Sequence, residues 1–296
     1  MRRRTAKAQS AMEYLMTYGW AILIIAVVLG ALFQLGVFNA GTFAPRAPPG
    51  ACQVFRSNGP GSTQFINLEG VCSGELPQYV GVFNGQSGYV NTAVDPAGQA
   101  EITVTVWANQ KSLITSGPGP CQDAVAAYNS LGFSFIVRTG ASGCNSPGAL
   151  NVYIGSTAGN NCAGNSALPL RTWSSLSLVY NGIDLVGYVN GIEVCSVTAT
   201  GSLTEGGPTR IGVGASNGEF FNGSLANIQI YNTSLSQAEI TALYDEGIGG
   251  APVRLQNLVG WWPLNGNAND YSGNNNNGVP SAVTYTNQWS SGYTAP

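Results

Sequence analysis

Residues Arg171 to Gly191 read RTWSSLSLVYNGIDLVGYVNG, which contains two alternating apolar runs that each end in an Asn-Gly pair. Alternation with a period of two is typical of a β-strand that buries one face. Asparagine followed by glycine accepts the positive φ angles of a tight turn and is the strongest short hairpin signal. The segment therefore predicts two antiparallel strands, Ser174–Gly182 and Leu185–Gly191.

Similar short segments recur along the rest of the chain. Further strands are predicted at Tyr79–Gly85, Glu101–Ala108, Phe133–Arg138, Leu150–Gly155 and Ala226–Asn232. One helix is expected over Ser234–Gly247. Ser236 would be its N-cap, Glu239 would complete a capping box, and Gly247 would end it. Many short strands with one short helix predict an all-β antiparallel jelly-roll sandwich.

The composition of the 296-residue chain excludes several classes of function. Because the chain has no histidine, Ser-His-Asp catalysis and His-ligated zinc or haem are ruled out. Charged residues make up 8 % of the chain, against roughly 25 % in an average soluble protein. A formal net charge of −3 argues against a nucleic-acid partner. The composition is typical of a turn-rich extracellular protein.

An uncharged segment, Gly19 to Phe38, follows a basic N-terminus that contains four of the eleven lysines and arginines. A helix of this length spans about 30 Å, the thickness of the hydrocarbon core of a bilayer. Basic residues before such a segment hold the N-terminus on the cytoplasmic side. We therefore predict a membrane-inserted helix with the rest of the chain outside, and a buried core helix is the alternative.

The sequence RRRTAKAQSAMEYLMTYGWAILIIAVV, which starts at Arg2, resembles the class III signal of archaeal type IV pilin-like proteins. The resemblance implies that residues 1–8 are a leader, which a prepilin peptidase cuts between Ala8 and Gln9. Residues 9–40 would then form the hydrophobic pilin-type helix, with Glu13 as the fifth residue of the mature chain. The alternative is an uncleaved signal anchor.

The position of Glu13 also predicts assembly. A carboxylate at the edge of an apolar helix is costly in lipid unless it is paired. Cleavage would create an α-ammonium group at Gln9, which could pair with Glu13 of an adjacent copy. Small residues would let such helices pack closely once they leave the bilayer. The expected partners are therefore copies of the same chain in an extracellular surface filament.

Six cysteines lie beyond the apolar segment: Cys52, Cys72, Cys121, Cys144, Cys162 and Cys195. An even number of cysteines outside the cell predicts disulfides. Cys52 with Cys72 is the only pair we predict, because both precede the main domain, and the other pairings stay open. These two lie in an expected Pro/Gly stalk and neck, residues 41–78.

The order of the predicted strands resembles the laminin-G-like, or concanavalin-A-like, jelly-roll family. The resemblance rests on VFNGQSGYV, ITVTVWA, the Arg171–Gly191 segment and FNGSLANIQIYNTSLSQAEITALY, Phe221 to Tyr244. The domain would span residues 79–296. The family's opening segment resembles LVGWWPLNGNANDYSGNNNNG, Leu258 to Gly278, so the domain looks permuted, with residues 250–296 supplying the opening strand. The alternative is that this strand completes the sheet of the next subunit.

The Asn-rich loop Asn265–Gly278 is a candidate calcium site. Calcium takes carboxylate, amide and carbonyl oxygens, and the candidate ligands are Asn267, Asp270, Asn274 and Asn276. The alternative is that asparagine and glycine simply form turns there.

Aromatic residues near the same loop are candidate sugar contacts, namely Trp261, Trp262 and Tyr271. Two sequons, at Asn222 and Asn232, could carry glycans outside the cell.

The paired carboxylates of a glycosidase are not evident, since no ExDxxE triplet occurs. We therefore expect no enzymatic activity. The sequence predicts a filament subunit that displays a lectin-like sandwich for adhesion to surface glycans. The alternatives are a monomeric membrane-anchored carbohydrate-binding protein and, less favoured, an anchored glycoside hydrolase.

Overall fold

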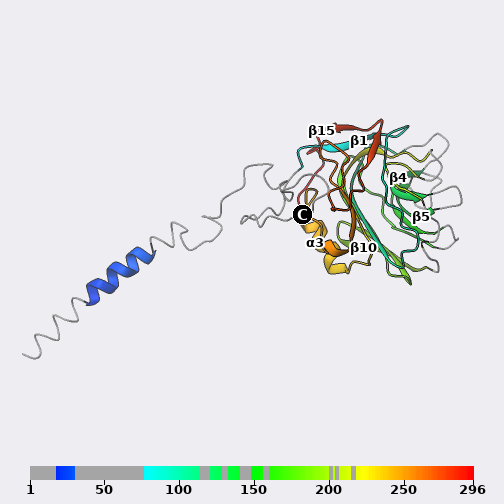
Figure 1. The fold of residues 1–296 in the computed structure, drawn as a ribbon. Coiled ribbons are helices and arrows are strands. Elements are labelled where there is room, and N and C mark those ends of the chain that lie inside the picture. Colours follow the sequence, from blue (N-terminus) through cyan, green and yellow to red (C-terminus); the bar gives the residue numbers. More distant parts are fainter. Residues whose placement is uncertain are drawn as a thin grey trace, which may run out of the picture. The chain divides into compact units, whose positions relative to one another are not determined.

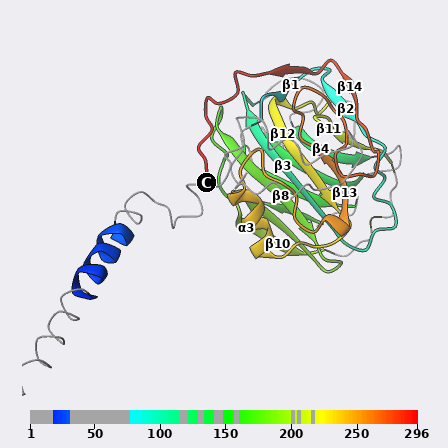
Figure 2. The same ribbon diagram turned by 60° about the vertical axis from the view of Figure 1, so that its left-hand side comes forward.

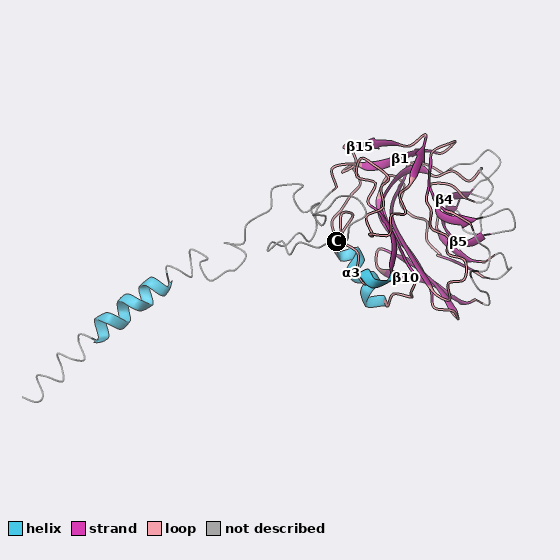
Figure 3. Cartoon of the chain, in the orientation of Figure 1, coloured by secondary structure: helices cyan, strands magenta, loops and turns pink. Residues whose placement is uncertain are grey.

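The computed structural model describes residues 18–30, 77–113, 121–128, 133–140, 148–155, 160–199, 203, 207–214 and 218–296. The chain divides into two compact units. The described part of the first is a helix over residues 18–30, and that of the second, from residue 77 onward, is a β-sandwich with one α-helix (Figure 3).

The helix at residues 18–30 carries exposed apolar side chains, and Trp20 and Ile22 are each 65 % exposed. These described residues lie within the helix expected over residues 9–40. Within the described residues, no helix has the length and apolar character needed to cross a bilayer. The leader cut at Ala8 and Gln9, and Glu13, lie outside the described residues.

The sandwich consists of two antiparallel sheets (Figure 1). In spatial order, the eight-stranded sheet contains β10 (Ile192–Thr198), β9 (Asp184–Val189), β8 (Trp173–Tyr180), β3 (Ile102–Gln110), β12 (Asn222–Tyr231), β1 (Val80–Asn84) and β15 (Thr284–Thr286), and β13 (Leu258–Trp262) pairs with β12. The seven-stranded sheet contains β14 (Val279–Ser281), β2 (Tyr89–Asn91), β11 (Thr209–Ile211), β4 (Cys121–Tyr128), β5 (Phe133–Gly140), β6 (Leu150–Ile154) and β7 (Asn161–Ala163). The predicted all-β sandwich is confirmed.

The hairpin between β9 and β10 follows from its turn residues. Asn190 and Gly191 both have positive φ, 51° and 75°, as a tight hairpin turn requires. Ile192 pairs with Val189 directly across this turn. The Asn-Gly signal therefore leads to the hairpin geometry it predicts.

The main core lies between the two sheets. Val104 and Leu176 of the eight-stranded sheet pack in one buried cluster with Val137 and Val152 of the seven-stranded sheet. Because side chains alternate along a strand, the residues between these core positions face outward from each sheet.

The C-terminal segment completes the sandwich of its own chain. In the register of β12 and β13, Ile228 lies opposite Trp262, while β15 pairs with β1 and β14 with β2. An irregularity between Ala226 and Gln229 divides β12, whose first half pairs with β1 and whose second half pairs with β13. No second copy is needed to supply this strand.

The α-helix α3 (Gln237–Asp245) begins with the predicted capping box. Ser236 accepts a hydrogen bond from the Glu239 N–H, and the Glu239 side chain accepts one from the Ser236 N–H. Ile240 and Leu243 pack against Val179 and Tyr188 on the outer face of the eight-stranded sheet (Figure 2). A short 3₁₀ turn, η2 (Leu255–Asn257), then leads into β13.

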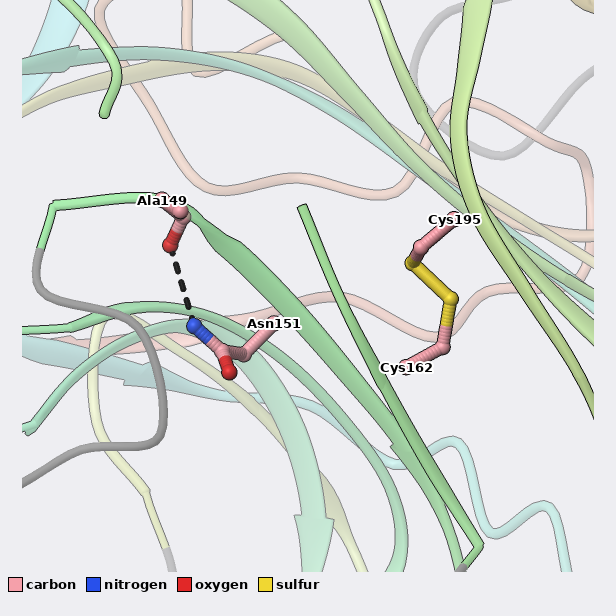
Figure 4. The surroundings of a disulfide bond; sticks show 4 residues. All are labelled: Ala149, Asn151, Cys162 and Cys195. Atoms are coloured by element: carbon pink, nitrogen blue, oxygen red, sulfur yellow. Dashed lines mark hydrogen bonds between the residues drawn. A yellow bond between two sulfur atoms is a disulfide. The ribbon is translucent and has the colours of Figure 1, made fainter. Parts of the chain in front are cut away.

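A disulfide between Cys162 and Cys195 joins β7 to β10, the edge strands of the two sheets (Figure 4). Cys121 is also disulfide-bonded. Cys52, Cys72 and Cys144 lie outside the described residues, so the predicted Cys52–Cys72 pair stays a prediction.

Candidate functional site

The outer faces of the two sheets differ in what covers them. The eight-stranded sheet carries a second apolar layer, in which Trp107 stacks on Tyr244 of the α3 helix with 5.8 Å between ring centroids. The C-terminal tail adds Trp289, which packs edge-on against Trp173. Figure 1 shows β4 and β5 on the opposite side of the sandwich from α3. Among the described residues, α3 and the C-terminal tail therefore cover the outer face of the eight-stranded sheet.

The outer face of the seven-stranded sheet carries polar and aromatic side chains on either side of two buried apolar residues. In strand register, one row runs through Tyr153, Ile136, Ala126, Arg210 and Asn91. Their neighbours along each strand, such as Val90 and Val152, belong to the core, so this row faces away from it. We call this surface the polar face; its members are Tyr89, Asn91, Asp123, Ala126, Ile136, Arg138, Tyr153, Arg210 and Glu219.

An ionic cluster stands on the polar face where β4 lies beside β5. Arg138 donates from Nε to Asp123 Oδ1 at 2.7 Å and from a terminal nitrogen to Oδ2 at 3.1 Å. The same terminal nitrogen donates to Glu219 Oε2 at 3.1 Å. A Cβ at Gly214 would come within 1.6 Å of Asp123 Oδ2. The cluster therefore needs glycine at that position.

Burial controls the ionisation of this cluster. Asp123 has no exposed surface, and burial raises its pKa to about 8 because the charged form loses its hydration. Arg138 opposes the rise in pKa, while Glu219 adds to it. Two carboxylates thus share one guanidinium in a site with little water.

Each arginine of the polar face lies against a tyrosine ring. The Arg138 guanidinium carbon is 5.0 Å from the centroid of the Tyr153 ring, and that of Arg210 is 6.0 Å from the Tyr89 ring. Contacts of this kind hold the guanidinium and the ring in place together. Both tyrosines are half-buried. Rigid aromatic rings beside amides and guanidinium donors suit a polar ligand with an apolar face.

No pattern in the sequence predicted these residues. Asp123, Arg138 and Glu219 belong to no motif, and 81 positions separate Arg138 from Glu219. The only signal in the sequence was the strand Phe133–Arg138 itself. The cluster forms because β4 pairs with β5, with Asp123 opposite Arg138.

The predicted calcium loop, Asn265–Gly278, uses its carboxylate internally. Asp270 is fully buried. Its Oδ1 accepts from the N–H groups of Trp261 and Ser272, at 2.9 and 2.8 Å. Its Oδ2 accepts from Ser272 Oγ and the Asn276 N–H, both at 2.8 Å. Since donors surround both oxygens, this arrangement does not fit a calcium ion.

The loop's asparagines are also engaged. Asn267 donates to Tyr271 Oη at 3.0 Å, and Asn274 and Asn276 both donate to the carbonyl of Val259 in β13. The described residues contain no group of three or more Cys, Asp or Glu side chains placed to hold a metal. As folded, the loop anchors β13 to the sandwich.

The predicted aromatic sugar contacts are mostly enclosed. Trp262 is 0 % and Trp261 6 % exposed. Trp262 donates from Nε1 to the Asn276 carbonyl, and Trp261 donates to Asn227 Oδ1 at 2.7 Å. Tyr271 is half-buried and lies edge-on to Trp261. Neither tryptophan ring presents a face to a sugar outside.

The two sequon asparagines differ in access. Asn222 begins β12 between two neighbouring strands, and its side-chain nitrogen donates to Ser112 Oγ at 2.7 Å. Asn232 follows β12 and is exposed, and its side-chain oxygen accepts a hydrogen bond from the Asn257 side chain.

Comparison with known proteins agrees with this fold. Among solved structures, the chain is similar to a Bacteroides ovatus protein assigned to carbohydrate binding, with a TM-score of 0.54 and 18 % identity over 71 % of this chain and 60 % of that one. The chain thus spans about three fifths of that protein's length. It is also similar to a heptameric SAP-like pentraxin from Limulus polyphemus, with a TM-score of 0.52 and 15 % identity over 71 % of this chain and 94 % of that one.

No curated protein matches the chain. The family model described as the concanavalin A-like lectin/glucanases superfamily matches residues 84–241, more than half of the sequence. These are the residues that form most of both sheets and the start of α3. The chain belongs to the concanavalin A-like lectin/glucanases superfamily.

Proposed function

We propose that this protein is a lectin-like carbohydrate-binding protein whose ligand site is the polar face. The observation that carries the proposal is the contrast between the two outer faces. α3 and the tail cover one, while the other bears two arginine–tyrosine pairs, Arg138 with Tyr153 and Arg210 with Tyr89. Membership of the superfamily and the fold likeness to the Bacteroides ovatus protein support the same function.

The chemistry of the face matches that of a sugar. A pyranose ring has an apolar face of C–H groups that packs on an aromatic ring, and hydroxyls at its edge that pair with amide and guanidinium groups. Buried aromatic contacts and charge-assisted hydrogen bonds are the interactions that contribute most to affinity at such sites.

A glycan array with the whole chain tests the proposal. We expect binding that Tyr153→Ala weakens. Tyr79→Ala is the matched control, because Tyr79 is also half-buried but precedes β1 of the other sheet. Equal loss in both variants, or no glycan bound by the parent protein, would contradict the proposal.

We propose binding without hydrolysis. A glycosidase holds two carboxylates on either side of the sugar bond, whereas Asp123 and Glu219 both accept hydrogen bonds from Arg138, and Asp123 is enclosed. Incubation with a bound oligosaccharide, followed by an assay for new reducing ends, tests this point. Release of reducing ends would restore the hydrolase alternative.

A second candidate adds assembly: a membrane-inserted subunit that polymerises into a surface filament and displays the sandwich. It is favoured by the helix at residues 18–30, whose exposed apolar side chains include Trp20, Ile22 and Val27. A helix that is apolar all round is stable only inside lipid or among other helices. The basic leader before it supports export, and the Cys162–Cys195 disulfide supports an oxidising compartment.

Mass spectrometry of the native N-terminus tests this candidate. A mature chain beginning at Gln9, and filaments lost in Glu13→Ala while glycan binding is retained, are the expected results. An intact leader on detergent-bound single molecules would leave only the membrane-anchored carbohydrate-binding protein.

A further inference from the structure

The C-terminal residues 287–296, which we call the strap, follow β15 and lie on the outer face of the eight-stranded sheet. Most side chains of the strap are exposed. Trp289 is buried, with 6 % of its surface exposed, and Tyr293 is half-buried. Figures 1 and 2 both place the C-terminus beside α3. The strap is therefore a surface segment that two aromatic side chains anchor.

The two anchors cover the tryptophans beneath them. Trp289 packs edge-on against Trp173 with 6.2 Å between ring centroids, and Tyr293 packs edge-on against Trp107 at 5.7 Å. Trp107 and Trp173 are each 4 % exposed. They belong to the same apolar cluster as Val80 of β1. The burial of this aromatic layer thus depends in part on the strap.

Trp289 also connects two strands that do not pair with each other. Its Nε1 donates to the Pro77 carbonyl at 3.0 Å, and its own carbonyl accepts from Trp173 Nε1 at 2.9 Å. Pro77 is the first described residue of the sandwich unit and leads into β1, whereas Trp173 begins β8, three strands away in the sheet. The strap therefore ties the point where the chain enters the sandwich to β8.

The strap is held by individual contacts rather than by a strand ladder. The Trp173 N–H donates to the Gly292 carbonyl at 2.8 Å, and the Ile248 N–H donates to Tyr293 Oη at 3.3 Å. None of residues 287–296 belongs to a strand. A chain end held in this way opens at a lower free energy than a paired strand of the core. We therefore expect the strap to open while both sheets stay intact.

Gly292 gives the strap one specific closed position. Its φ is +81°, and a Cβ there would lie 2.0 Å from the Arg171 carbonyl oxygen. Glycine combines a positive φ with such a close approach of two backbone segments. A single added methyl group would therefore prevent the strap from closing.

We propose that the strap is a latch, which holds the chain at Pro77 while it is closed and opens locally without unfolding of the sheets. In the closed state, a pull on the chain before Pro77 is shared between β1 and β8. In the open state, β1 carries that pull alone, and Trp107 and Trp173 are uncovered. The latch lies on the other sheet from the polar face, so this inference goes beyond the proposed function and does not depend on it.

Hydrogen–deuterium exchange of the whole chain, read at single residues, tests whether the strap opens by itself. The amides of Trp173 and Ile248 are direct reporters, because each donates to the strap. We expect both to exchange at a rate that low denaturant concentrations leave unchanged, while Leu178 in the middle of β8 exchanges only through global unfolding. If both reporters exchange as slowly as Leu178, the strap does not open alone and the proposal is wrong.

Gly292→Ala should hold the strap open. Gly98→Ala is the matched control, because Gly98 has the same φ of +81° and no atom lies within 4 Å of its added Cβ. In Gly292→Ala we expect exchange about tenfold faster or more at Trp173, at Ile248 and across residues 77–84. Gly98→Ala should keep the rates of the parent protein. Parent rates in both variants, or equal acceleration in both, would overturn the proposal.

Trp289→Phe tests the connection to Pro77, because phenylalanine keeps an aromatic anchor but has no N–H to donate. We expect about two- to tenfold faster exchange across residues 77–84, the effect of one lost hydrogen bond. Unchanged exchange there, in this variant and in Gly292→Ala, would show that the strap does not hold the entry of the chain. The denaturation midpoint of each variant checks that the sheets are intact.

Discussion

Asp123 combines full burial with two charged neighbours: Arg138 donates two hydrogen bonds to its carboxylate, and Glu219 accepts a hydrogen bond from the same guanidinium. Removing one partner from such a cluster costs more than the pair contributes, because it leaves a buried charge unpaired. The stability of the sandwich should therefore depend on pH, through the Asp123 carboxyl, and on the room that Gly214 leaves beside that carboxyl.

The first prediction concerns pH. Burial raises the pKa of Asp123 from 3.8 to about 8, so between these values the folded chain holds a proton that the unfolded chain has lost. Its contribution to the free energy of unfolding is complete below pH 3.8 and is lost as the pH rises through about 8. We expect urea midpoints to fall from about pH 5 to about pH 8.

Asp123→Asn is the control for this prediction, because it cannot titrate and should show a flatter pH dependence, whatever its overall stability. A parent protein whose stability rises over the same interval would contradict the sign. Glu101 does not interfere: hydrogen bonds from Ser234 lower its pKa, so its contribution is already complete above pH 4.5.

The second prediction concerns Gly214. In Gly214→Ala the new Cβ would lie 1.6 Å from Asp123 Oδ2 and 2.7 Å from Glu219 Oε2, so the cluster must move apart. We expect a loss of about 3–5 kcal/mol in the free energy of unfolding, the cost of breaking a buried ion pair. In the matched control, Gly164→Ala, the nearest atom would be 3.4 Å away. If chemical denaturation shows an equally small loss in the free energy of unfolding for both variants, the cluster is not rigid.

At the scale of elements, the sheet edges are secured differently. β7 and β10 form one pair of edges and are joined by the Cys162–Cys195 disulfide. β14 and β15 form the other pair, where the chain itself passes from one sheet to the other within a few residues. Pro280 in β14 also lacks the N–H that a further strand would need.

The third prediction tests the disulfide. Replacing both Cys162 and Cys195 by Ala opens a loop with a sequence separation of 33 and should cost about 3–4 kcal/mol on the chain-entropy model. Denaturation without reductant measures the loss. A variant as stable as the parent would mean that strand pairing alone holds this edge.

The fourth prediction concerns the sequons. In a glycosylating host, Asn232 should be occupied and Asn222 should not, because the Asn222 side chain is held by Ser112 within paired strands, whereas Asn232 is exposed. Peptide mass spectrometry of the parent and of Asn232→Gln measures occupancy. Full occupancy at Asn222 would contradict the argument from its hydrogen bond to Ser112.

For the whole molecule, the sandwich closes because its C-terminal segment returns to both sheets. β13 and β15 enter the eight-stranded sheet, and β14 enters the other. Asp270 and the asparagines around it hold the loop between β13 and β14 through hydrogen bonds. The loop that resembles a metal site by composition thus serves the closure of the fold.

The fifth prediction follows from this closure. Since Asp270 is saturated by donors, adding calcium or a chelator should change neither thermal stability nor glycan binding. Asp270→Ala, by contrast, should destabilise the chain by about 1–3 kcal/mol or more, because its buried N–H partners lose their acceptor. A rise in stability with calcium that is lost in Asp270→Ala would restore the predicted ion site.

Much of the fold was predictable because it follows from local chemistry. Alternating apolar residues predict strands such as β8 and β9, the Asn190-Gly191 pair predicts the hairpin turn between β9 and β10, and Ser236 with Glu239 predicts the start of α3. Each of these signals depends on residues only a few positions apart. For the same reason the sequence also indicated the family.

The residues of the candidate site could be found only from the tertiary structure. Which face of a strand meets the core depends on register, and a shift of one residue exchanges the faces; register irregularities near Asp123 and Ala226 make such shifts here. Trp262, whose exposure looked plausible from composition, is enclosed because β13 pairs with β12 under the loop. The polar face exists only because β2, β11, β4, β5 and β6, distant in sequence, lie side by side, and no short-range pattern encodes that neighbourhood.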